Sequence, residues 1–292
     1  MVGVMKKPAV QPNHDPREVL DFGLGTARAL EPSPDFLAAA AALGVEFEPG
    51  DVDRLGRYLG MLLAANEKAN LTSITDAGEA WTKHILDSLT LLAVLAELPA
   101  GARVIDVGTG GGVPGVPLAI VMPHLSFTLL EATGKKVEFL RQAAAMLGLG
   151  NVEVVQGRAE RLGQDRGERG GQGREGGHRE RYDAVIARAV GPLNVLAELT
   201  VPLAKAPAAD RPSGVIALIK GQKAADEVVS AAEALRQVRA RHEATLDTPT
   251  GRIVVLTKDA PTPRTYPRAD GEPKRSPLGG ALRRGGDAEP EA

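Results

Sequence analysis

The chain has 292 residues, of which 43% are hydrophobic and 25% are charged, and its formal net charge is −2. It contains no cysteine, which excludes disulfides, thiolate nucleophiles and thiolate metal sites, and no apolar run approaches the roughly 20 residues of a membrane span. Lys6 and Lys7 lead into prolines rather than into an apolar segment, so we expect no secretory signal, no membrane partner and a cytoplasmic protein.

The first hundred residues are predicted to form a tail and a helical extension. Residues 1–32 are rich in proline and polar side chains, which is typical of a disordered tail. Ser33-Pro34 is typical of a helix N-cap followed by proline at the first helical position. Apolar residues then recur at helical spacing after Asp51 and again over 80–98. We therefore assign residues 33–100 to an N-terminal helical extension.

The stretch from Arg103 to Leu118 is the most informative part of the chain. Val104, Ile105 and Val107 form a short β-branched run typical of a buried strand. Four glycines follow within five positions, and two prolines then stand where a first helical turn would begin. A strand, a glycine turn and a helix N-terminus in this order predict a nucleotide-binding loop. The alternative is a tight strand-to-helix turn that binds nothing.

Two cofactors are compatible with this loop. Gly110, Gly112 and Gly115 satisfy the spacing of the dinucleotide fingerprint. Asp106, at the strand end before the loop, would repel a pyrophosphate but attract the sulfonium and ammonium groups of S-adenosylmethionine. Glu131, which ends the next predicted strand, suits the ribose hydroxyls of either cofactor. The acid before the glycines therefore favours S-adenosylmethionine.

From Arg103 onward, strands and helices alternate, as in a parallel α/β sheet. Predicted strands cover 126–131, 152–156, 183–187 and 214–220, and predicted helices cover 135–147, 192–205 and 224–241. Two further extended pieces, 244–247 and 252–257, predict a β-hairpin that closes the sheet. Such a hairpin is typical of Rossmann-like methyltransferases, whereas dinucleotide dehydrogenases continue the βαβ repeat. We assign residues 101–258 to this core.

Two polar segments are predicted to lie outside the packed core. Gly163–Arg181 contains no apolar residue, so it cannot bury enough surface to offset its ordering entropy. We predict a disordered insertion at 163–181; the alternative is an arginine- and glycine-rich arm that touches RNA, although its acids interrupt the positive charge. Residues 259–292 are predicted to form a polar, proline-rich tail.

Several side chains are expected at the sheet edge that carries the glycine loop. Ala159 and Glu160 follow the third strand, where they could meet an adenine. Arg188 and Lys220 follow the fourth and fifth strands, whose carboxyl ends line the ligand crevice of such sheets. Salt bridges to the acids of the neighbouring strand ends would explain these cations structurally; contact with an anionic polymer and a guanine edge would explain them functionally. His84 is a further candidate for a functional residue. The alternative is that it is a hydrogen-bonded structural residue near Asp87.

Five motifs, in chain order, resemble those of the bacterial small-subunit ribosomal RNA guanine-N7 methyltransferases, also called the glucose-inhibited division protein B family. The motifs are Asn70–Ser73, Lys83–Ser88, Asp106–Gly115, Arg158–Glu160 and Ala187–Ala189. The resemblance covers about Val52 to Thr257. One departure is Val113, which stands where relatives often carry Phe or Leu.

The resemblance implies a Rossmann-like class I methyltransferase fold, with a mostly parallel sheet, that uses S-adenosyl-L-methionine to methylate N7 of a guanine in 16S rRNA. The implied cofactor contacts are Gly108, Val113, Glu131, Ala132, Thr133, Ala159, Glu160 and Arg188. We add Lys83, His84 and Lys220 as candidate substrate contacts. The expected partner is the 16S rRNA, in the small ribosomal subunit or an assembly intermediate, and the expected state is a monomer. Because guanine N7 has an exposed lone pair, we assign no general base.

Two other functions are compatible with the sequence. A nicotinamide-dependent oxidoreductase would use the same glycine loop, and a non-catalytic RNA-binding protein would keep the fold without transferring a methyl group. Binding of S-adenosylmethionine rather than NAD distinguishes the first alternative. Methyl transfer to small subunits distinguishes the second.

Overall fold

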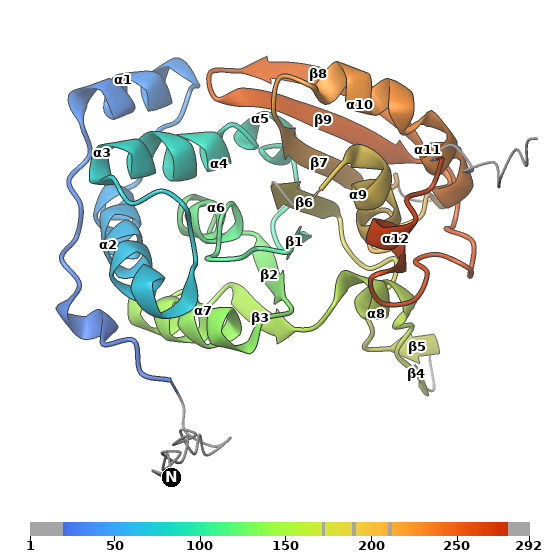
Figure 1. The fold of residues 1–292 in the computed structure, drawn as a ribbon, viewed down its shortest axis with the longest axis horizontal. Coiled ribbons are helices and arrows are strands. Elements are labelled where there is room, and N and C mark those ends of the chain that lie inside the picture. Colours follow the sequence, from blue (N-terminus) through green and yellow to red (C-terminus); the bar gives the residue numbers. More distant parts are fainter. Residues whose placement is uncertain (1–19, 171–172, 189–190, 210–211, 280–292) are drawn as a thin grey trace, which may run out of the picture.

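A seven-stranded sheet forms the centre of the computed structural model, which describes residues 20–170, 173–188, 191–209 and 212–279. Its strand order is β3-β2-β1-β6-β7-β9-β8, parallel from β3 to β7 and antiparallel for the last two strands (Figure 1). The strands are β1 Arg103–Val107, β2 Ser126–Glu131, β3 Val152–Gln156, β6 Ala184–Arg188, β7 Val215–Lys220, β8 Ala240–Thr248 and β9 Gly251–Lys258. The predicted mostly parallel sheet with a C-terminal hairpin is confirmed.

Strand β1 is buried because it lies between β2 and β6, and its apolar residues face helices on both sides of the sheet. The chain reverses its strand order there: β2 and β3 lie to one side of β1, and β6 and β7 to the other. In open α/β sheets, ligands bind outside the carboxyl ends of the strands at such a reversal. The glycine loop that follows β1 therefore occupies the binding edge.

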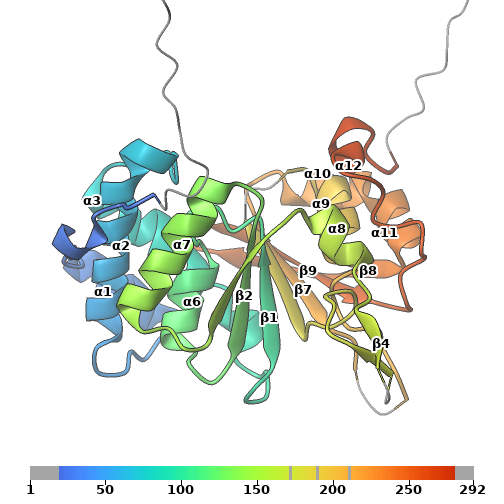
Figure 2. The same ribbon diagram turned by 90° about the horizontal axis from the view of Figure 1, so that it is seen from below.

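Helices cover both faces of the sheet, as Figure 2 shows. One face carries the N-terminal helices with α6 and α7, and the other carries α8, α9 and α11. The longer helices are α1 Pro34–Ala42, α2 Asp51–Ala69, α6 Gly115–Val121, α7 Gly134–Leu147, α8 Ala159–Gln164, α9 Leu193–Thr200, α10 Ala224–Ser230 and α11 Ala232–Val238. Within the described ranges, no helix has the length and apolar character needed to cross a membrane.

The N-terminal helices share their apolar core with the sheet layer. Leu55, Leu59 and Leu62 of α2 are fully buried in the same cluster as Phe139 and Leu140 of α7. At α1, the Ser33 hydroxyl accepts a hydrogen bond from the Phe36 N–H, as its N-cap position predicts. The extension is therefore packed onto the sheet layer rather than lying apart from it.

The single helix predicted over 80–98 is interrupted. The structure divides this region into α3 Ala77–Ala80, a π-helical segment η2 Trp81–Leu86, α4 Asp87–Leu89 and α5 Leu92–Leu95. A π-helical turn widens the backbone and re-aims its side chains, and such turns are frequent at functional sites. The apolar spacing of the sequence could not reveal this, because the pattern of buried residues persists through the interruption.

The prediction of disorder over 163–181 is wrong for the described residues of this segment. They form the end of α8 and a short antiparallel hairpin, β4 Glu168–Gly170 with β5 Gly173–Glu175; residues 171–172 lie outside the description. Arg179 is only 6% exposed. Hydrogen bonds to distant backbone, rather than apolar burial, order this segment, and composition carries no signal for them.

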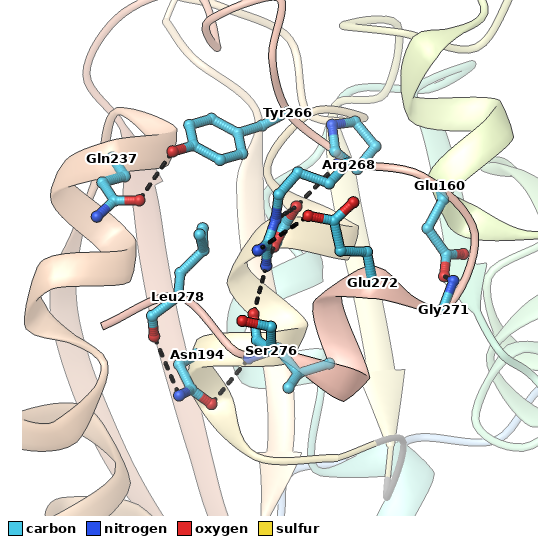
Figure 3. Close-up of polar contacts among 12 residues, drawn as sticks. Glu160, Asn194, Gln237, Tyr266, Arg268, Gly271, Glu272, Ser276 and Leu278 are labelled. Carbon is cyan, nitrogen blue, oxygen red and sulfur yellow. Dashed lines mark hydrogen bonds and ion pairs between the residues drawn. The ribbon is translucent and has the colours of Figure 1, made fainter. Parts of the chain in front are cut away.

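Parts of both predicted tails are also packed. Phe22 and Leu24, within the expected N-terminal tail, are buried, and Phe22 meets Phe139 edge to face at 5.7 Å between ring centroids. At the other end, residues 261–279, which we call the C-terminal strap, contain α12 Glu272–Arg275 and lie beside α9 (Figure 3). The remainder of the two predicted tails, 1–19 and 280–292, lies outside the described residues.

Candidate functional site

The glycine loop is held from below by Asp106, the fourth residue of β1. Its carboxylate is fully buried, and Oδ2 accepts hydrogen bonds from the Thr109 hydroxyl at 2.6 Å and from the Gly115 N–H at 2.9 Å. Oδ1 is buried with no hydrogen-bond partner in the described structure. Burial raises the pKa of Asp106 to about 6, although both hydrogen bonds and the charge of Arg188 oppose the rise.

Close packing explains why glycine stands at the start of α6. A Cβ added to Gly115 would lie 2.3 Å from Leu129 Cδ2 and 2.9 Å from Asp106 Oδ2. From the other side, the buried Tyr58 hydroxyl of α2 donates a 2.8 Å hydrogen bond to the Gly111 carbonyl. The loop is thus fixed by both the sheet and the N-terminal helices, so its backbone is pre-organised for a ligand.

Glu131 closes the loop from the end of β2. Its Oε2 accepts from the Gly110 N–H at 3.1 Å and its Oε1 from the Thr133 N–H at 2.8 Å. With Asp106 on Gly115, two N–H groups of the glycine loop already bind carboxylates. A dinucleotide pyrophosphate would have to approach these two acids, whereas a cationic ligand would be attracted by them. The geometry therefore disfavours the NAD alternative.

Cavity I, of about 250 Å³, lies beside the glycine loop at the carboxyl ends of β1, β2 and β3. Five predicted cofactor residues line it: Gly108, Glu131, Ala132, Ala159 and Glu160. The sequence missed Val195 and Leu199 of α9 and Gly271, Pro273 and Lys274 of the C-terminal strap, which also line it. The strap residues carry no apolar spacing that could have placed them there.

The other three predicted cofactor residues do not line cavity I. Val113 is nearly buried and packs in the apolar cluster of the N-terminal helices. Thr133 acts through its backbone N–H, which orients Glu131. Arg188, the last residue of β6, lines a second cavity instead.

Cavity II, of about 520 Å³, opens between the N-terminal extension and the carboxyl ends of β6 and β7. Three predicted residues, His84, Arg188 and Lys220, line it together, although they come from distant parts of the chain. Asp87, on the turn after His84, and Thr72 line it as well. Neither had been given a role from the sequence, although both lie within motifs that carry the family resemblance.

The guanidinium of Arg188 is held on three sides. Nη1 donates to the Lys83 carbonyl at 2.6 Å and to Asp87 Oδ2 at 3.1 Å, and Nη2 donates to His84 Nδ1 at 3.2 Å. Asp87 Oδ1 in turn accepts from the Thr250 hydroxyl at 2.6 Å. Arg188 forms a salt bridge, which is the structural alternative to a substrate contact, but its partner is Asp87 rather than Asp106 or Glu131.

These contacts fix the tautomer of His84. Because arginine can only donate, Nδ1 must be the acceptor, so the proton lies on Nε2, which faces the Thr72 hydroxyl at 2.9 Å. Burial, followed by the charge of Arg188, lowers the pKa of His84 to about 4. His84 is therefore a neutral brace for Arg188 at physiological pH, which is the structural role weighed against a catalytic one.

We expect the NMR titration of His84 to show a midpoint near pH 4 rather than near 6.5. Because the folded-state pKa lies below the unfolded one, the neutral ring contributes stability above about pH 6.5 that is lost as the pH falls toward 4. In Arg188→Ala the midpoint should rise, but not reach 6.5, because burial is the larger cause. A midpoint near 6.5 in the wild-type protein would contradict this assignment.

The two lysines among the candidate substrate contacts differ in placement. Lys220 ends β7 in cavity II, where its ammonium lies 2.7 Å from Glu227 Oε2 and donates to the Gly191 carbonyl at 2.7 Å. The Lys83 side chain is half exposed, does not line cavity II and pairs with Glu79 at 3.0 Å. Lys220 thus shapes the cavity wall, whereas Lys83 contributes its carbonyl to Arg188.

A family model and curated relatives match most of this chain. A family model described as "rRNA small subunit methyltransferase G" matches residues 51–252. A protein of that name from Sorangium cellulosum is 48% identical over 252 residues, covering 86% of this chain and 98% of its own length. Another, from Symbiobacterium thermophilum, is 41% identical over 249 residues, covering 82% and 94%. The solved structure of a putative O-methyltransferase from Klebsiella pneumoniae aligns with a TM-score of 0.48 at 17% identity, covering 78% and 97%.

Proposed function

The chain belongs to the rRNA small subunit methyltransferase G family, and we propose that cavity I holds its methyl donor while cavity II receives the target guanine of 16S rRNA. The enzyme is a 16S rRNA (guanine-N7)-methyltransferase that uses S-adenosylmethionine. The observation that carries the assignment of cavity I is the pair of carboxylates bound to the glycine loop, which suits a cationic cofactor.

The residues around cavity I fit S-adenosylmethionine. Glu131 can accept hydrogen bonds from the ribose hydroxyls, and Ala159 and Glu160 also line the cavity, where an adenine would pack. Asp106 orients the loop through Oδ2 and keeps an unpartnered oxygen, and its negative charge attracts the cationic methionine end. When bound, the cofactor supplies an electrophilic methyl group.

The chain's own task on the guanine side is positioning. N7 attacks with its free lone pair and loses no proton, so no base is required. The neutral His84 has both ring nitrogens engaged, consistent with a bracing role. Arg188 can donate to guanine O6, to a phosphate or to the cofactor carboxylate while N7 stays free. Holding reactants in line and excluding water can lower a barrier by roughly 7–11 kcal/mol in favourable cases.

The partner of the enzyme is 16S rRNA. We further propose that the enzyme is a monomer and acts in the cytoplasm, where small subunits assemble. Mass mapping of 16S rRNA from cells with and without this protein tests the function. One N7-methylguanosine should disappear when the protein is absent. RNA binding without methyl transfer would support a non-catalytic protein, and tight binding of NAD instead of S-adenosylmethionine would support an oxidoreductase.

Asp106→Asn should lower the affinity for S-adenosylmethionine about tenfold or more, equivalent to about 1.4 kcal/mol of binding free energy. It should lower the affinity for uncharged adenosine less. Asparagine keeps an acceptor for Thr109 and Gly115 but removes the charge. Affinity of the wild-type enzyme should rise with pH through about 6, as Asp106 ionises, and that of the variant should not. Isothermal titration with both ligands from pH 5 to 8 measures this. Equal losses for the two ligands would refute the electrostatic role.

The same variant should be more stable without ligand at neutral pH. The folded-state pKa of Asp106 is raised from 3.8 to about 6, so the folded protein holds its proton longer than the unfolded chain. Wild-type stability therefore falls between pH 4 and 6 relative to Asp106→Asn. Above pH 6 the difference should reach about 2–3 kcal/mol.

A further inference from the structure

The C-terminal strap, residues 261–279, returns to the binding edge of the sheet after β9 has completed it. Figure 3 shows the strap lying against α9, with Arg268 and Tyr266 directed toward the helices and Gly271 next to Glu160. More than a hundred positions separate Glu160 from Gly271, yet the Gly271 N–H donates to Glu160 Oε1 at 2.8 Å. The strap therefore meets the cofactor side of the fold at a specific residue.

Buried ionic and polar contacts anchor the strap. Glu198 of α9 is fully buried, and its two oxygens accept from Arg268 Nε at 2.8 Å and Nη2 at 2.6 Å. A planar, bidentate pair of this kind fixes orientation as well as position. The Tyr266 hydroxyl donates to the Gln237 side chain at 2.8 Å, and Gln164 donates to the Pro267 carbonyl at 2.7 Å. The strap is thus joined to α8, α9 and α11.

The anchored strap supplies one wall of cavity I. Gly271, Pro273 and Lys274 line the cavity together with Glu131, at the end of β2, and Ala132, which follows it. Pro273 is buried, whereas Lys274 is exposed. A proline ring offers a rigid apolar surface, and a flat aromatic base gains most from such a surface when water is excluded.

We propose that the C-terminal strap is an integral part of the cofactor site, with Pro273 as the apolar contact for the adenosine end of S-adenosylmethionine. This rests on the proposed function, because it assumes that cavity I holds the cofactor. Glu160 connects the strap to the cavity. Its carboxylate accepts a hydrogen bond from the strap backbone, and the residue also lines cavity I. Ligands that contain adenosine should stabilise the strap when they bind. Displacing the strap should lower the affinity for these ligands.

Alanine and tryptophan variants at two prolines, Pro273 and Pro277, test the proposal in the full-length protein. Pro273→Ala removes part of the cavity wall. It should lower the affinity for S-adenosylhomocysteine and 5′-methylthioadenosine about three- to tenfold, as measured by isothermal titration. Pro273→Trp fills the cavity and should weaken both by more than tenfold. Pro277 lies in the same strap but does not line cavity I. Pro277→Ala and Pro277→Trp should therefore bind both ligands like the wild type.

Fluorescence and hydrogen exchange give readouts independent of activity. The single native tryptophan, Trp81, is 1% exposed in the N-terminal cluster, so a tryptophan introduced by P273W reports on its own surroundings. Its emission should change when S-adenosylhomocysteine saturates the protein, and that of P277W should not. In the wild type, the same ligand should slow amide exchange over residues 270–275.

The outcomes separate this inference from the proposed function. If the wild type binds S-adenosylhomocysteine, but Pro273→Ala binds it equally and exchange over 270–275 is unchanged, the strap is not part of the site. If the wild type binds neither adenosine-containing ligand, the assignment of cavity I fails instead. Should P273W not fold, the alanine variant and the wild-type exchange experiment still decide.

Discussion

Replacing Arg179 with methionine is expected to lower the free energy of unfolding by about 3–5 kcal/mol, the largest loss of stability that we predict. The buried guanidinium donates to four backbone carbonyls, of Gly163, Thr262, Pro263 and Tyr266. Methionine fills a similar volume but donates nothing, so the four carbonyls lose this donor; the contacts to Gly163 and Thr262 are buried and the other two are part-buried. Each buried acceptor left unpaired costs about 1–3 kcal/mol.

Thermal unfolding measures this effect. At roughly 2–4 °C per kcal/mol for a domain of this size, the melting temperature should fall by roughly 6–20 °C. Arg179→Lys should recover only part of the loss, because an ammonium group cannot reproduce the planar fork. Limited trypsin digestion of Arg179→Met should cleave first after Arg264 or Arg268, since the strap has lost its clamp. A melting temperature within 2 °C of the wild type would contradict the role of Arg179.

The adjacent hairpin provides a matched control. Glu168 and Glu175 are cross-strand partners, so a Gly-Gly turn can replace residues 169–174 without changing the path of the flanking chain. We expect this replacement to cost less than about 1 kcal/mol. Replacing the whole of 163–181 would instead remove Arg179, which joins this segment to the strap.

The order of elements could be predicted because burial leaves a periodic trace in the sequence. Strand β1 is a β-branched run, and the helices that cover the sheet repeat apolar residues at helical spacing. The acids Asp106 and Glu131 could be placed for a similar reason: each lies at the carboxyl end of a recognisable strand. Their neighbourhood follows from the rule that such ends form the binding edge of the sheet.

Contacts made by polar residues over long sequence distances could not be predicted in this way. Arg179 and Glu198 are buried charges in segments that the sequence assigns to a disordered insertion and to a helix of the core, and their partners Thr262 and Arg268 lie in the predicted C-terminal tail. Nothing in composition distinguishes an arginine that caps four carbonyls from one in solvent. The same limit applies to Asp87, which directly follows the π-helical segment and pairs with Arg188 about a hundred positions away.

Arg188→Ala should lower the turnover number by roughly ten- to a hundredfold, the largest loss of activity that we predict. Three of the five N–H donors of Arg188 are used within the protein, which leaves, among the contacts of the described residues, two for a ligand in cavity II. A hydrogen bond to a charged group is worth about 1.5–3 kcal/mol. Donation to guanine O6 or to a phosphate would hold the base while N7 stays free.

The charge around Arg188 also suits a reaction that makes guanine cationic. Its ion pair with Asp87 neutralises the guanidinium, so the positive charge that develops on N7 meets little repulsion. Asp87→Asn keeps the guanidinium in cavity II and should therefore cost less turnover than Arg188→Ala. Arg188→Lys should recover only part of the lost turnover, because lysine cannot hydrogen-bond to Asp87, His84 and the Lys83 carbonyl at once.

Methyl transfer to unmodified small subunits, scored by borohydride–aniline cleavage at N7-methylguanosine, measures these variants. Titration with S-adenosylhomocysteine and thermal unfolding separate a chemical loss from weak cofactor binding or misfolding, since removing Arg188 leaves the Asp87 carboxylate without its cation. If Arg188 acts on the guanine, turnover falls while cofactor affinity changes little, because Arg188 lines cavity II and not cavity I. Full activity of a folded Arg188→Ala enzyme would remove Arg188 from the site. A methyl group on any atom other than N7 would overturn the placement of the guanine.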